Sequence, residues 1–137
     1  MIRLELRRDL VILACAISAG IHGALVPAHF EEGMGAGLGF VAATVLLAAL
    51  VLALTRYPAS ALALAATAVV LLGLLASYLL AVTTGLPLLH PEPEPVDGLA
   101  LATKAIEAGG LLAALDLLWH ARPGVAPALP QPKGLTT

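Results

Sequence analysis

Residues 60–83 read SALALAATAVVLLGLLASYLLAVT, a run that contains no Asp, Glu, Lys or Arg. About 20 consecutive apolar residues are enough for a helix to cross the hydrocarbon core of a bilayer. Comparable runs occur elsewhere in the chain, and only the last of them has charges in its interior. Spans are therefore predicted at 10–30, 36–55, 60–83 and 98–119. The predicted fold class is an all-α, integral membrane four-helix bundle.

The composition supports a membrane class and excludes several others. Hydrophobic residues make up 60% of the chain and charged residues 12%, whereas a soluble domain has about 25% charged residues. A net charge of −2 offers no basic surface, so we expect no nucleic-acid partner. A single cysteine excludes a disulfide scaffold. The lipid bilayer is the first partner that the sequence predicts.

Proline, glycine and charge mark the breaks between the predicted spans. The breaks are Glu31-Glu32-Gly33, Arg56-Tyr57-Pro58 and the proline-rich segment 85–97. Residues 1–120 are therefore predicted to form a single four-span transmembrane domain. Four prolines after His120 prevent the last helix from continuing. We expect residues 121–137 to form a proline-rich cytoplasmic tail.

The loop charges predict the orientation. With four crossings, one side of the membrane receives the Lys and Arg residues outside the spans, namely Arg3, Arg7, Arg8, Arg56, Arg122 and Lys133. The opposite loops contain only acidic charges, namely Glu31, Glu32, Glu92, Glu94 and Asp97. Cytoplasmic loops have the excess of Lys and Arg. Both termini are predicted to be cytoplasmic, with the acidic loops outside the cell (inner) membrane.

Small residues at helical spacing predict close helix packing. Gly20 lies between Ala16 and Ala24 at i, i+4 spacing, and Gly35 and Gly39 form a GxxxG pair. Small residues allow helix backbones to approach closely in a bilayer, where apolar surface alone does not hold helices together. These positions are predicted to make contacts within the bundle or between protomers.

The last span contains an intramembrane charge pair. Lys104 and Glu107 are three residues apart and so share one helix face. A charge inside the bilayer is costly and by default indicates function. The alternative is a self-neutralising pair in which Lys104 extends toward the outer interface.

Histidine and carboxylate side chains near the outer face form a candidate metal site. Its members are predicted to be His22, His29, Glu32, His90 and Glu107. They converge only if the first and last spans are neighbours. Imidazole and carboxylate together suit Zn, Fe, Mn or Cu(II). Haem b, with His22 as an axial ligand, is a variant of the same prediction.

Two stretches carry a resemblance. One is Ile21-His22-Gly23-Ala24-Leu25-Val26-Pro27-Ala28-His29-Phe30-Glu31-Glu32 before a glycine-rich span, and the other is Thr84-Gly85-Leu86-Pro87 before Pro-Glu-Pro. In both, the chain resembles small uncharacterised four-span membrane proteins of high-GC bacteria. The resemblance implies a bacterial multi-pass protein and implies neither a site nor an activity.

Three functions remain open. The chain contains no nucleophile elbow, P-loop or dinucleotide fingerprint, so an enzyme is not favoured. The favoured hypothesis is a non-enzymatic membrane protein that acts by assembly, as a homo-oligomer or as an accessory subunit of a membrane complex. The first alternative is a metal- or haem-binding protein with a His/Glu site near the outer face. The second is a transporter of a proton, cation or small solute that uses Glu107.

Overall fold

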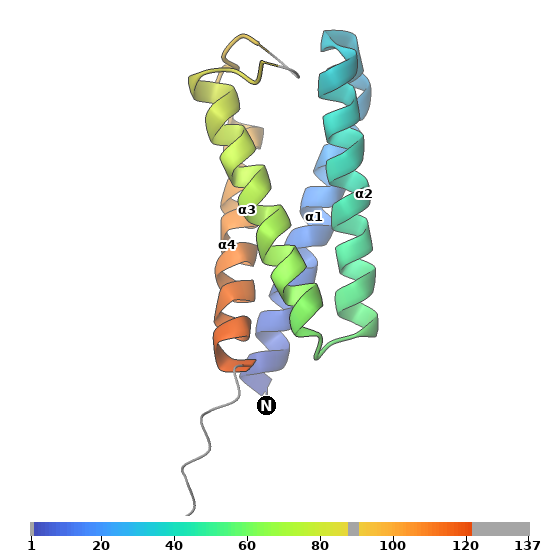
Figure 1. Cartoon of the computed structure of the whole chain (residues 1–137), viewed down its shortest axis with the longest axis vertical. Coiled ribbons are helices and arrows are strands. Elements are labelled where there is room, and N and C mark those ends of the chain that lie inside the picture. Colours follow the sequence, from blue (N-terminus) through green and yellow to red (C-terminus); the bar gives the residue numbers. More distant parts are fainter. Residues whose placement is uncertain (1, 88–90, 122–137) are drawn as a thin grey trace, which may run out of the picture.

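The chain folds into four long helices. The computed structural model describes residues 2–87 and 91–121 (Figure 1). The helices are α1 (Ile2–Glu32), α2 (Met34–Arg56), α3 (Ala61–Thr83) and α4 (Gly98–Ala121). Each is long and apolar enough to span a membrane, which confirms the prediction of an all-helical chain with four helices of membrane-spanning length. His90 and almost all of the predicted tail lie outside the described residues.

Three predicted spans coincide with helices to within a few residues, and the helix that contains the first span, 10–30, is longer than that span. α1 begins at Ile2 rather than Leu10, about two turns earlier. The charged residues in this segment do not interrupt a helix, because they have long or polar side chains that helices tolerate on exposed faces. Pro27 does not interrupt α1 either.

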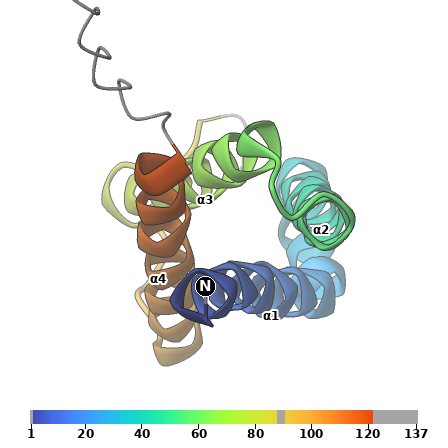
Figure 2. The ribbon, with the colours of Figure 1, turned by 90° about the horizontal axis from the view of Figure 1, so that it is seen from below.

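The helices form a closed ring in which neighbours in sequence are neighbours in space. α1 packs on both α2 and α4, α3 packs on α4, and the contact between α2 and α3 is the sparsest of these. Figure 2 shows the ring along its axis. The first and last spans therefore touch, which is the condition on which the predicted outer site depended.

The two ends of the bundle differ in charge. The end formed by the α1–α2 turn and the α3–α4 connection, here called the acidic end, contains Glu31, Glu32, Glu92, Glu94 and Asp97. At the opposite end lie the start of α1, the α2–α3 connection and the end of α4 (Figure 1). That end, here called the basic end, contains Arg7, Arg8 and Arg56.

The helix boundaries follow from local chemistry. Gly33 alone separates α1 from α2, in an extended backbone conformation with φ 167° and ψ 155°. Ser60 caps α3 by accepting a hydrogen bond from the Ala63 amide at 3.1 Å, and Asp97 accepts one from the Ala100 amide at 2.9 Å at the start of α4. Side-chain oxygens at these positions satisfy amides that have no partner within the helix.

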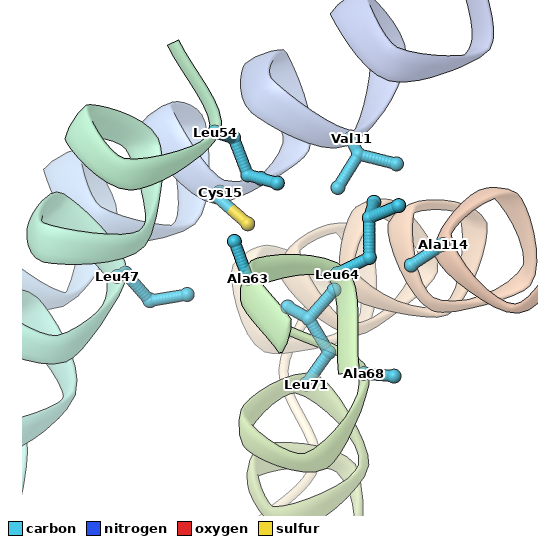
Figure 3. Close-up of a cluster of buried hydrophobic side chains, with 9 residues drawn as sticks. All are labelled: Val11, Cys15, Leu47, Leu54, Ala63, Leu64, Ala68, Leu71 and Ala114. Atoms are coloured by element: carbon cyan, nitrogen blue, oxygen red, sulfur yellow. The ribbon is translucent and has the colours of Figure 1, made fainter. Parts of the chain in front are cut away.

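A hydrophobic cluster fills the half of the bundle near the basic end (Figure 3). Its nine buried members come from all four helices and are Val11, Cys15, Leu47, Leu54, Ala63, Leu64, Ala68, Leu71 and Ala114. The outward faces are also apolar, with Leu62 on α3 81% exposed. Helices that are apolar on every face are typical of membrane spans.

Candidate functional site

Lys104 and Glu107 meet inside the bundle. Lys104 Nζ lies 2.7 Å from Glu107 Oε2, and the two side chains are 15% and 0% exposed. The structure thus brings together the two members of the predicted intramembrane pair. The contact is also the one that the alternative, a self-neutralising pair, requires.

Ser18 supplies the second partner of Glu107. Its Oγ donates a hydrogen bond of 2.6 Å to Glu107 Oε1, from α1 to α4. Both carboxylate oxygens are therefore bonded, as a fully buried charge requires. Sequence reasoning missed the role of Ser18. The one feature of the sequence that pointed to Ser18 is its position four residues before His22, on the same helix face. That position indicates a contact with Glu107 only once α1 and α4 are known to touch.

His22 continues this network toward the acidic end. Its Nδ1 lies 2.9 Å from the Ser18 carbonyl oxygen and 3.3 Å from Ser18 Oγ. A carbonyl oxygen only accepts, so Nδ1 carries the hydrogen and Nε2 of the neutral ring is a hydrogen-bond acceptor. His22 is only 7% exposed. Both of its hydrogen bonds use Nδ1, so within residues 2–87 and 91–121 Nε2 has no partner.

A cavity of about 460 Å³ lies directly above this network, between the four helices and the α3–α4 connection. His22 and Lys104 line its deep end, whereas Glu32, Glu94 and Asp97 line its mouth at the acidic end. Its volume falls in the range of about 300–1,000 Å³ that is usual for small-molecule sites. Most of its remaining wall is apolar, as in such sites.

Tyr78 contributes a second unsatisfied polar group to the cavity wall. Its ring lies 5.6 Å from Lys104 Nζ, close enough for a cation–π interaction. Its hydroxyl is buried and has no hydrogen-bond partner in the described part of the chain. A buried hydroxyl normally has a partner, so the Tyr78 hydroxyl is a buried polar atom left unpaired, in a residue that lines the same cavity as His22.

The candidate metal ligands are distributed along the cavity rather than gathered at one point. His29 Nε2 lies 3.8 Å from Glu32 Oε2 near the mouth, and the His29 ring stacks on Phe40 at 3.5 Å. Glu107 is held by Ser18 and Lys104 at the deep end. Within residues 2–87 and 91–121, no three His, Cys, Asp or Glu side chains are placed to hold a metal. Because His90 lies outside those ranges, the five-residue metal site stays a prediction.

Of the predicted packing glycines, Gly20 makes no close contact within the bundle. A Cβ added at Gly20 would meet no atom within 4 Å, whereas one at Gly110 would lie 2.8 Å from Ala14 Cβ. Gly37 approaches the Phe30 ring, and Gly39 lines the cavity. Gly35 is partly buried. Gly110 on α4 therefore lies close against Ala14 on α1.

An ion pair that the sequence did not reveal joins the helices at the basic end. Arg7 on α1 bonds to Asp116 on α4. His120 Nδ1 lies 2.7 Å from the Asp116 carbonyl oxygen. Asp116 is thus engaged by the neighbouring helix through its carboxylate and by His120 of its own helix through its carbonyl oxygen.

No protein-family model, curated protein or solved structure matches this chain. Its function is therefore inferred from its own geometry.

Proposed function

We propose that this chain is a multi-pass protein of a bacterial inner membrane that binds a small, mainly apolar molecule in the cavity at its acidic end. The observation that carries the proposal is an apolar cavity of about 460 Å³ whose lining includes His22, with Nε2 unpaired among the described residues, and Tyr78, with its buried hydroxyl unpaired.

The cost of burying polar groups supports a ligand-binding site at the Lys104–Glu107 pair rather than a purely structural role for the pair. Placing a charge at the centre of a membrane helix costs about 2.5–3.5 kcal/mol on insertion scales. Ser18 and Lys104 satisfy Glu107, but the buried Tyr78 hydroxyl has no partner among the described residues. A buried polar group left unpaired costs about 1–3 kcal/mol. A ligand that bonds to this hydroxyl recovers part of that cost on binding.

The charges of the two ends support the orientation. Arg7, Arg8 and Arg56 lie at the basic end, and the acidic end contains no Lys or Arg among the described residues. Cytoplasmic ends are rich in these residues. The cavity then opens on the outer side.

Labelling of an introduced cysteine tests the cavity. In a Cys15→Ala background, Thr103→Cys places a thiol in the wall of the cavity, and Leu101→Cys places one on the exposed face of the same helix. The protein is reconstituted in lipid nanodiscs and treated with iodoacetamide. We expect 1-naphthol to slow labelling at Thr103→Cys. We expect no slowing when Ala43→Phe fills the cavity. Unchanged labelling of Thr103→Cys in the presence of aromatic probes would overturn the proposal.

Assembly is a second candidate function, supported by the outer face of α1. Ala16, Gly20 and Ala24 are all exposed, and the space next to Gly20 is open. If these small residues make a close helix contact, the partner is therefore another protein molecule, in a homo-oligomer or in a larger membrane complex. Transport through Glu107 has less support, because the cavity reaches Lys104 and Glu107 is fully buried behind it.

A further inference from the structure

We infer that the ligand of this cavity is a neutral molecule with an apolar body and a hydroxyl group, and that the hydroxyl donates a hydrogen bond to His22 Nε2. The inference rests on the proposed function and specifies the chemical class of the ligand.

The charge balance at the deep end favours a neutral ligand. The charge of Lys104 is matched by Glu107 at 2.7 Å, so the pair is neutral as a unit. A cationic ligand would meet the Lys104 ammonium, and an anionic ligand would compete with Glu107 for it. Either would also lose its hydration without a new partner of opposite charge. The acidic side chains at the mouth, Glu32 and Asp97, are accessible to solvent and disfavour anions at the entrance.

The hydrogen-bonding groups at the deep end favour a hydroxyl. His22 Nε2 accepts, so the ligand must present an O–H or N–H hydrogen. Lys104 Nζ has donors beyond the one that Glu107 accepts, and the Tyr78 O–H is without a partner in the described residues. A hydroxyl donates one hydrogen bond and accepts up to two, so it complements both kinds of group. An ether or a carbonyl only accepts and would leave Nε2 unpaired.

The walls favour a ligand with an apolar body. Leu25, Phe40, Leu74 and Leu86 line the cavity. A molecule with an apolar body is stabilised by leaving water for a cavity lined by such side chains.

Two isosteric probes test the inference. 1-Naphthol and 1-methylnaphthalene have nearly the same shape, and only the first has a hydroxyl. Each is used to protect Thr103→Cys, in the Cys15→Ala background, from iodoacetamide in nanodiscs. The two are compared at equal measured concentration in the bilayer. We expect 1-naphthol to protect at a concentration about threefold to tenfold lower than 1-methylnaphthalene does. This ratio corresponds to the free energy of one net hydrogen bond.

His22→Leu removes the acceptor and should reduce the difference between the two probes, while Lys104 and Tyr78 can still donate to the hydroxyl oxygen of 1-naphthol. Should that variant fail to fold, ¹⁵N spectra of histidine-labelled protein with His22 intact replace it. The Nε2 resonance is then expected to shift with 1-naphthol and not with 1-methylnaphthalene. Equal protection by both probes would overturn the hydroxyl assignment and leave the binding cavity intact. Protection by neither would overturn the proposed function itself.

Discussion

Ser18 on α1 and Glu107 on α4 are joined by a hydrogen bond of 2.6 Å between two side chains that have no solvent exposure. The bond links the first and last helices of the ring at the level of the cavity floor. Removal of its donor therefore affects both the packing of the bundle and the position of the Lys104–Glu107 pair.

Replacement of Ser18 by alanine is expected to destabilise the bundle. The change leaves Glu107 Oε1 buried without a partner, at a cost of about 1–3 kcal/mol. The measurement is reversible unfolding in mixed micelles. Ser77→Ala is the control, because Ser77 Oγ donates to the carbonyl of Gly73 in its own helix and is exposed. Equal effects of the two substitutions would contradict the importance of the bond between helices.

The Lys104–Glu107 pair should behave as one unit. Lys104→Met alone leaves a buried carboxylate and Glu107→Gln alone leaves a buried ammonium, and each is expected to cost about 3–5 kcal/mol. The double variant removes both charges and should lose less stability than the two single losses added together. A double-mutant cycle of unfolding free energies measures the coupling. A coupling near zero would mean that the two charges are stabilised independently.

Gly110 and Gly109 form a matched pair for a packing test. A methyl group at Gly110 would lie 2.8 Å from Ala14 Cβ and 3.3 Å from Leu71 Cδ1, whereas one at Gly109 would meet no atom within 4 Å. Gly110→Ala is expected to cost about 1–3 kcal/mol through overpacking. Gly109→Ala should be neutral or slightly stabilising, since alanine favours helix. Thermal unfolding measures the stability of both variants. A larger loss of stability in Gly109→Ala than in Gly110→Ala would exclude this packing.

Gly20→Leu tests assembly without touching the core of one molecule. The added side chain points into open space, so the monomer should keep its stability. A contact between protomers at this stripe would be blocked, and the mass measured by native mass spectrometry would fall to that of the monomer. Gly73→Leu is the control on α3, where the space is also open. Unchanged assembly in Gly20→Leu would exclude this face as the interface.

The orientation can be measured in cells. In the Cys15→Ala background, Val96→Cys places a thiol at the acidic end, and Ala59→Cys places one at the basic end. A membrane-impermeant maleimide added outside the inner membrane should label Val96→Cys alone until the membrane is permeabilised. Labelling of Ala59→Cys alone would reverse the proposed topology.

The helices could be predicted from sequence more completely than the site could. Hydropathy and the Ser60 and Gly33 boundaries are local properties, so the spans were predictable. The shared face of Lys104 and Glu107 followed from helical periodicity in the same way. The role of Ser18 and the Arg7–Asp116 pair could not be foreseen, because they depend on how α1 is rotated against α4. The same is true of Gly20 and Gly110, whose local sequence does not reveal which of them faces a neighbouring helix.

The connection of α1 to α2 through Gly33 alone has a consequence for biogenesis. With so short a connection, the two helices enter the bilayer as one hairpin in the proposed topology, and the charges that must cross with the turn are those of Glu31 and Glu32. In the same topology, the α3–α4 hairpin carries residues 84–97, with their prolines and acidic side chains, across the membrane. If the first hairpin is integrated before the second, α4 meets an α1 surface that already presents Ser18 to Glu107.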